Sequence, residues 1–240
     1  MKNVFFKKGL YICLLAMTAL CATTFTACTQ EDSDKLGDAA VSQRYMVAFA
    51  ANGETYAYAG FSKDKVRIFK PIKLTGEQKI FANGKNMQYN ELNSYHLVEY
   101  SYSSQLEKNT NEVKFSFVRD KSTTLENTIK KDNGAYIALP TELTTIEKGK
   151  PVVWKGAARG EKENIEVSLE LNEKSKSYVM VAGKMTEDGK GFVFDELPTE
   201  KGKYKLTLRR IIQQPTVQND RTAQGEMVVS YFDTKDIQLK

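Results

Sequence analysis

The sequence is poor in the side chains that build catalytic and metal-binding centres. Its 240 residues include three cysteines and one histidine, His96. A Ser-His-Asp triad would have to use that histidine, and a metal site with two histidines is excluded. The stretch YHLVEYSY favours a histidine packed among aromatic side chains on a strand. No glycine-rich loop leads from a strand into a helix, so nothing indicates a nucleotide site. We therefore expect no catalytic residues, no metal and no cofactor, and predict that the protein is not an enzyme.

A strong excess of charge of one sign is also missing from most of the chain. The formal net charge is +5, but Lys2, Lys7 and Lys8 stand at the start with no acid among them. Without those three lysines the charge falls to +2. Such a small excess gives no reason to propose nucleic acid as a partner.

The first 27 residues have the pattern of a secretory signal peptide. The basic start is followed by GLYICLLAMTALCATTFTA, an apolar stretch that ends in small residues. An uncleaved membrane anchor is the alternative, because the stretch approaches spanning length. Cleavage after Ala27 would remove Cys13 and Cys21 and leave Cys28 alone. The mature chain would then have no internal disulfide and would depend on its apolar core.

Cys28 stands in the sequence FTAC, which resembles the lipobox of bacterial lipoproteins. It departs from the common pattern at Phe25, where leucine is usual, and at Thr26. The resemblance implies that Cys28 carries lipid, with acyl chains such as palmitate. Two or more such chains hold a protein stably on a membrane, so the membrane is the implied partner. The alternative is an incidental cysteine in an ordinary leader.

The residues after this cysteine are acidic. Glu31, Asp32 and Asp34 resemble the export signal of Bacteroidota-type surface-exposed lipoproteins. That resemblance implies a protein anchored in the outer membrane and facing the outside of the cell. The alternative is a plain solvated tether, with the protein on the periplasmic face. Residues 28–43 are polar and lack periodicity, so the sequence predicts a flexible, disordered tether that begins with the lipidated cysteine.

From residue 44 onward apolar and polar residues alternate with a period of two, which predicts β-strands. An Asn-Gly pair at 52–53 separates two alternating runs and predicts a hairpin, and a second pair at 83–84 predicts another turn. EVKFSFV is a clear alternating strand, whereas STTLENTIKK fits either a short helix or an irregular crossover. We assign residues 44–133 to an N-terminal β-sandwich domain.

A second series of short strands fills residues 134–240. Turn-rich clusters separate these strands, and no long amphipathic helix interrupts them, which favours a β-sandwich. Trp154 is expected in its core. The polar stretch KKDNG at 130–134 marks the boundary between the two halves. The predicted fold class is therefore all-β, with two immunoglobulin-like β-sandwich domains. The strands expected in this half are AYIALP, PVVWKG, NIEVSLEL, SYVMVAG, GFVFDELP, YKLTLRRII and EMVVSYFD.

The segment 135–240 resembles the immunoglobulin-like IPT/TIG type of domain found in bacterial surface proteins. The matching features are a glycine before PVVWKG, a short loop into NIEVSL, and the strand in LP…GKYKLTLRR that leads to the closing strand GEMVVSYF. The sequence departs from the pattern where it reads KGAARGEKEN, because a GxGF loop is usual there. The resemblance implies a module that binds, spaces or presents and does not catalyse.

Tyrosines are concentrated early in the folded part of the chain. Seven of the twelve lie between residues 45 and 102, which draws attention to this half as a binding region. Tyrosine offers a flat apolar ring with a polar tip, suited to sugar rings or to a protein partner. The candidate binding platform is Tyr56, Tyr58, Tyr100 and Tyr102. The alternative is packing, because tyrosine is a good strand former and is often half-buried.

Together these features predict a lipid-anchored cell-envelope protein with a non-catalytic binding or presenting role. A glycan or another envelope protein is the expected partner. The alternative is a structural subunit of fimbria-like or adhesin type, which would need an exchangeable end strand, and EMVVSYFDTKDIQLK is the candidate. A hydrolase that brings distant carboxylates together is the third possibility.

Overall fold

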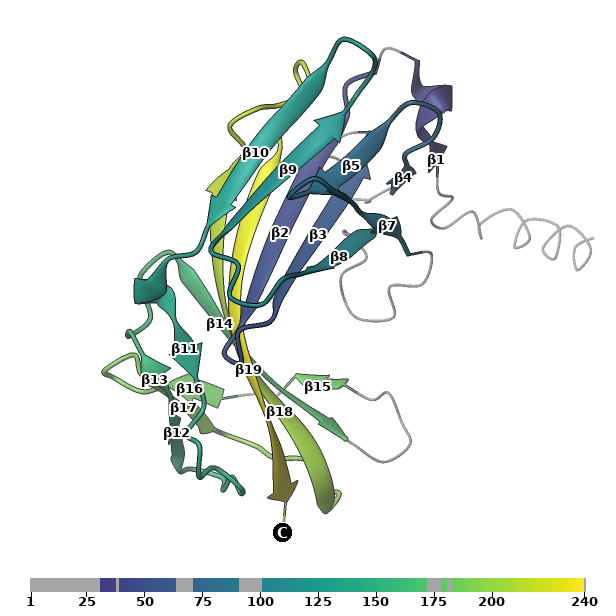
Figure 1. Cartoon of the computed structure of the whole chain (residues 1–240). Helices are drawn as coiled ribbons and strands as arrows, with labels where there is room; N and C mark the ends of the chain where they lie inside the picture. Colours follow the sequence, from purple (N-terminus) through teal and green to yellow (C-terminus); the bar gives the residue numbers. More distant parts are fainter. Residues whose placement is uncertain are drawn as a thin grey trace, which may run out of the picture.

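The computed structural model describes residues 31–37, 39–63, 71–90, 101–171, 178–180 and 183–239 (Figure 1). Most of these residues lie in strands, and none of them lies in an α-helix. The all-β class expected from the two-residue period is therefore confirmed. The leader 1–27, Cys28, His96 and Tyr100, all singled out from the sequence, lie outside the described residues.

The described elements are short in the first half and include two long strands at the end of the chain. The first half contains β1 (Glu31–Asp32), η1 (Ser33–Leu36), β2 (Ser42–Ala50), β3 (Thr55–Ser62), β4 (Ile72–Lys73), β5 (Lys79–Ala82), β6 (Lys85–Asn86), β7 (Gln88–Tyr89), β8 (Tyr102–Leu106), β9 (Glu112–Val118), β10 (Thr124–Lys130) and η2 (Asn133–Ala135). The second half contains β11 (Ile137–Ala138), β12 (Pro151–Val153), β13 (Lys155–Gly156), β14 (Glu163–Leu171), β15 (Tyr178–Met180), β16 (Gly183–Met185), β17 (Gly191–Phe194), β18 (Gly202–Pro215) and β19 (Glu226–Leu239).

One eight-stranded sheet organises the molecule, in the order β15-β14-β18-β19-β2-β3-β8-β7. Its two longest strands, β18 and β19, pair antiparallel along their whole length and run through the molecule from end to end (Figure 1). The sheet β10-β9-β5-β6 covers the part built by β2 and β3, while β12-β17-β16 and β11-β13 lie beside the other part (Figure 1). The fold is thus a β-sandwich in which several smaller sheets pack on one large sheet.

Both Asn-Gly pairs form the turns that the sequence predicts. Residues 52–53 join β2 to β3, which pair antiparallel. Residues 83–84 join β5 to β6, and both Asn83 and Gly84 have positive φ angles, of 50° and 76°. Two consecutive positive φ angles are what a tight type I′ hairpin turn requires, and asparagine and glycine adopt them most readily. The local sequence therefore determines these two hairpins.

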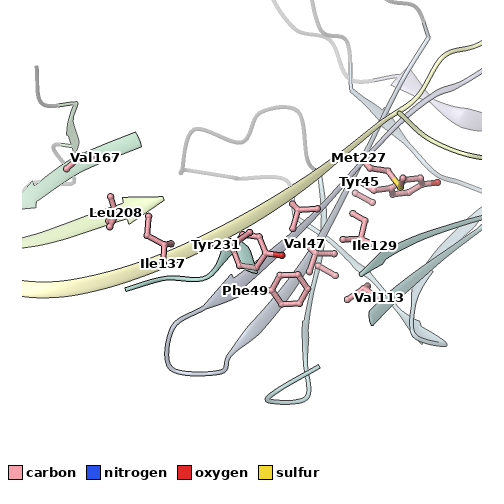
Figure 2. Close-up of a cluster of buried hydrophobic side chains, with 14 of the residues drawn as sticks. Tyr45, Val47, Phe49, Val113, Ile129, Ile137, Val167, Leu208, Met227 and Tyr231 are labelled. Carbon is pink, nitrogen blue, oxygen red and sulfur yellow. The ribbon is translucent and has the colours of Figure 1, made fainter. Parts of the chain in front are cut away.

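The packed faces bury one continuous apolar core that joins both halves of the chain. EVKFSFV supplies Val113, Phe115 and Phe117, all without exposed surface. Tyr45 of the large sheet stacks on Phe115 of the covering sheet at 4.7 Å between ring centroids. Figure 2 shows core side chains distributed along the large sheet, from Val167 and Leu208 at one end, past Tyr231, to residues of β2, β9 and β10 at the other.

The large sheet crosses the boundary expected near residue 133. β19 runs parallel to β2 over Glu226–Phe232, so the last strand of the chain pairs with the first strand of the predicted N-terminal domain. Arg210 adds a buried polar link, because its guanidinium donates to the carbonyl oxygens of Ala135 at 3.0 Å and Ala157 at 2.5 Å. The β-sandwich fold is established, whereas the count of two domains stays a prediction.

The structure differs from the expected flexible tether at residues 31–37 and 39–43. β1 pairs with β4, and the Ser33 hydroxyl accepts a hydrogen bond from the Thr75 backbone N–H at 2.8 Å. Leu36 and Val41 are buried in the core. These two apolar side chains are too far apart to produce a periodic pattern, but each fills a site in the core. The prediction of disorder was therefore wrong for this part of the segment.

STTLENTIKK forms the strand β10 and is neither a helix nor an irregular crossover. Its alternation is hidden because the polar residue Asn127 occupies an inward position and is 1% exposed. The side-chain amide oxygen of Asn127 accepts hydrogen bonds from the backbone N–H groups of Val217 and Gln218 at 2.8 and 3.0 Å. A polar group can be buried in this way when its hydrogen bonds are satisfied. Those partners are about 90 residues away in sequence, so the pattern alone could not indicate them.

Candidate binding face

Two of the predicted platform residues, Tyr56 and Tyr58, point outward from β3. The alanines between and after them, Ala57 and Ala59, have no exposed surface, while both tyrosines are half-buried. This is the alternation of a strand with one face on the core and one face turned away from it. The strand therefore carries its tyrosines on one side and its alanines on the other.

The outward face continues over neighbouring strands through the register of the sheet. Met46 of β2 lies opposite Tyr58, and Val228 of β19 lies opposite Met46. Ile211 of β18 packs with them to form a small apolar cluster separate from the main core. Met46 and Val228 are buried beneath the half-buried members of this side of the sheet. We call the following side chains, which point away from the main core, the tyrosine face: Met46, Tyr56, Tyr58, Arg209, Ile211, Val228 and Phe232.

Ring contacts and hydrogen bonds fix Tyr56 within this face. Its ring lies 6.3 Å from that of Phe232, and its hydroxyl donates to a carboxylate oxygen of Glu54 at 2.9 Å. Burial, followed by the Glu54 hydrogen bond, raises the pKa of Tyr56. Burial likewise raises the pKa of Tyr58, while the charge of Arg209 acts in the opposite direction. Both phenols are therefore neutral at physiological pH and present polar tips beside apolar rings.

Small and polar residues occupy the middle of the face. Ala48 and Ser230 lie side by side on β2 and β19, with Tyr56 opposite Ala48 and Ile211 opposite Ser230. The Ser230 hydroxyl and the Arg209 Nε atom are buried and have no hydrogen-bond partner among the described residues. Such groups are costly to bury unpaired. Ser230 has no exposed surface, so its hydroxyl lies beneath the face and is not presented to a partner. What the tyrosine face offers for noncovalent contact is its half-buried aromatic rings and one guanidinium on a hydrogen-bonded sheet.

Tyr102, the third platform residue that the structure describes, does not join this surface. Tyr102 lies opposite Ala59 on the inner face of the sheet and is 5% exposed. Its hydroxyl accepts the Leu74 backbone N–H at 2.6 Å, and burial raises its pKa to about 12. Tyr100 lies outside the described residues. The four tyrosines do not form one exposed platform, because Tyr102 faces the core.

Sequence reasoning missed the part of the tyrosine face that comes from the end of the chain. Arg209, Ile211 and Phe232 occupy outward positions in the strands predicted from YKLTLRRII and EMVVSYFD. The alternation in those strands indicated that such side chains would point away from the core. It did not indicate that β19 would lie beside β2, which is what brings Phe232 next to Tyr56.

The described part of the chain offers little for metal chemistry or for a membrane span. Among its residues, no group of three or more His, Cys, Asp or Glu side chains could hold a metal ion. No helix in that part is long and apolar enough to cross a membrane.

Comparison with known proteins identifies no family. No protein-family model matches the chain, and no curated protein matches it. Among solved structures, one similar chain is that of the three N-terminal domains of the bacteriophage RB49 highly immunogenic outer capsid protein, Hoc. The match covers 80% of this chain and 70% of that one, at 10% sequence identity and a TM-score of 0.22. A likeness at that level supports no argument about this protein.

Proposed function

We propose that this protein is a lipid-anchored cell-envelope protein that binds a partner and does not catalyse a reaction. The observation that carries the proposal is the tyrosine face. Tyr56, Tyr58 and Phe232 project from adjacent parts of the large sheet, and each is only half-buried. Half-buried aromatic rings held on a sheet lose little conformational entropy on binding. A glycan or another envelope protein is the proposed partner.

Lipid on Cys28 would hold the β1–β4 edge of the folded part at a short distance from the membrane. Glu31, the first described residue, already pairs with the folded part through β1 and β4. Three residues of fully extended chain span at most about 11 Å. An anchor at Cys28 would thus keep the β1–β4 edge near the lipid surface. The proposed location is the outer membrane, facing the exterior, with Glu31, Asp32 and Asp34 as the export signal.

The position of β19 favours binding over the alternative of an exchangeable structural subunit. An exchangeable strand is easiest to release from a sheet edge. β19 instead lies between β18 and β2 over Glu226–Phe232, and its pairing with β18 extends to Leu239. Removing this strand would divide the large sheet.

The test is a screen of glycans and envelope proteins against the full chain and a Tyr56→Ala, Tyr58→Ala double variant. Tyr136→Ala is the matched control, because Tyr136 is 40% exposed and follows η2, away from the tyrosine face. We expect a partner that binds the wild type and the control and loses at least tenfold in affinity for the double variant, with the melting temperature retained.

Equal binding by the double variant would contradict the proposal. If that variant unfolds, Arg209→Gln provides the second measurement, since it removes a charge from the same face and leaves both tyrosines in place. Unchanged affinity of a folded Arg209→Gln variant, together with an unfolded double variant, would indicate that the tyrosines serve packing.

A further inference from the structure

A second region with the character of a ligand site lies on the other side of the large sheet, where β4 to β8 meet. A hollow of about 560 Å³ opens there. This is within the range of roughly 300–1,000 Å³ that is typical of small-ligand sites. It is lined by Tyr102, which faces away from Tyr56 and Tyr58. The hollow and the tyrosine face are therefore separate.

Two tyrosines form the aromatic wall of this hollow. The rings of Tyr89 and Tyr102 meet edge to face, with centroids 5.2 Å apart and planes at 62°. Tyr102 is buried and tied to the backbone of Leu74, so it supports the half-buried Tyr89. Aromatic side chains held in this way are suited to contact with the apolar face of a sugar ring.

The charged groups that line the hollow are all cationic. Lys73 places its ammonium nitrogen 4.9 Å from the centroid of the Tyr89 ring, and Lys79 lines the same hollow. No carboxylate is among the described residues that line it. The local charge disfavours a cationic ligand and favours one with a carboxylate or a similar anionic group.

Amide groups complete the lining. Asn86 and Gln88 are exposed, and Gln78 is half-buried. The side-chain oxygen of Gln78 is buried and has no hydrogen-bond partner among the described residues. When the Gln78 side chain turns toward the hollow, a ligand hydroxyl can donate to this oxygen and satisfy it. Amides beside an aromatic ring can contact both the hydroxyl groups and the ring of a sugar.

We propose that this hollow binds an acidic saccharide, with the anionic group near Lys73, a sugar ring against Tyr89 and a hydroxyl donating to Gln78. The proposal rests on the lining of the hollow and not on the tyrosine face. It assigns a second binding site to the protein and names the chemical class of its ligand.

The experiment measures binding of trigalacturonic acid to the full chain by isothermal titration calorimetry, with maltotriose as the neutral probe. Lys73→Gln and Gln78→Met are the test variants. Lys150→Gln is the matched control, because it removes one lysine charge as Lys73→Gln does. Lys150 is exposed and lies in the other half of the chain. Gln78→Met removes an acceptor that has no partner, so it is expected to leave the melting temperature unchanged.

We expect trigalacturonic acid to bind, and we expect its affinity to fall as salt is added. Lys73→Gln and Gln78→Met should each reduce affinity at least tenfold, while Lys150→Gln and the Tyr56→Ala, Tyr58→Ala double variant should bind like the wild type. Equal affinity for maltotriose, displacement by equimolar inorganic phosphate, or unchanged binding by both test variants would overturn the proposal. Loss of binding in the tyrosine double variant alone would also overturn it and would assign the saccharide to the tyrosine face.

Discussion

Replacing Asp220 with alanine is expected to destabilise the protein strongly, because it breaks a buried ion pair. A carboxylate oxygen of Asp220 lies 2.9 Å from the Arg119 guanidinium, and the two side chains are 3% and 4% exposed. The same oxygen accepts the Val41 backbone N–H at 2.8 Å, and Arg119 donates to the Ala39 carbonyl oxygen at 2.7 Å. The pair therefore joins the loop between β18 and β19 to the end of β9 and to the segment before β2.

The expected loss follows from what the substitution leaves behind. Removing one partner of a buried ion pair typically costs about 3–5 kcal/mol, because the remaining charge stays buried without compensation. Glu77→Ala is the control, because the Lys121–Glu77 pair has a similar distance of 3.2 Å but side chains that are 86% and 56% exposed. Exposed pairs contribute only about 0–1 kcal/mol.

Urea unfolding followed by far-ultraviolet circular dichroism provides the measurement, with the free energy of unfolding extrapolated to water. A double variant, Arg119→Met with Asp220→Leu, should recover much of the loss, because it leaves no unpaired charge. A loss below about 1 kcal/mol for Asp220→Ala, equal to that of Glu77→Ala, would refute the assignment of this pair as a buried link.

Two further predictions concern Tyr102 and Cys28. Since burial raises the pKa of Tyr102 to about 12 and an unfolded tyrosine ionises near pH 10, its contribution to stability is present below pH 10. About 2–3 kcal/mol should be lost as the pH rises from 10 to 12. Tyr102→Phe should remove this part of the pH dependence, measured as the difference in unfolding free energy between urea titrations at pH 9 and pH 11.5. If the variant shows the same difference as the wild type, Tyr102 is not its source. Cys28→Ser should move the protein from the membrane fraction to the soluble fraction, because it removes the lipid acceptor. A variant that still partitions into the detergent phase would exclude Cys28 as the anchor.

Local features of the fold could be predicted because they depend on neighbouring residues. The turn at 83–84 follows from an Asn-Gly pair in which both residues have positive φ angles, and the turn at 52–53 uses the positive φ angle of Gly53. The outward position of Tyr56 and Tyr58 follows from strict alternation with alanines. Trp154 was expected in the core and is 3% exposed. Each of these inferences required only a few consecutive residues.

The features that failed or were missed depend on contacts between distant segments. Residues 31–43 look polar, but Leu36 and Val41 find apolar sites in the core. The strand β10 was not predicted, because the polar residue Asn127 occupies one of its inward positions and finds its hydrogen-bond partners in the loop after β18. Alternation alone did not show which side of its strand Tyr102 would take. The pairing of β8 with β3 places it opposite Ala59, on the side that faces the core.

By itself the sequence determined the all-β class, the hairpin turns and the sides of the strands that carry apolar residues, because backbone preferences and two-residue periodicity act locally. Only the tertiary structure decided that β19 lies parallel to β2, that Phe232 lies beside Tyr56, and that Lys73, Gln78 and Tyr89 line one hollow. The physical reason is that strand order is set by which apolar faces bury each other best, a property of the whole chain that no short stretch encodes.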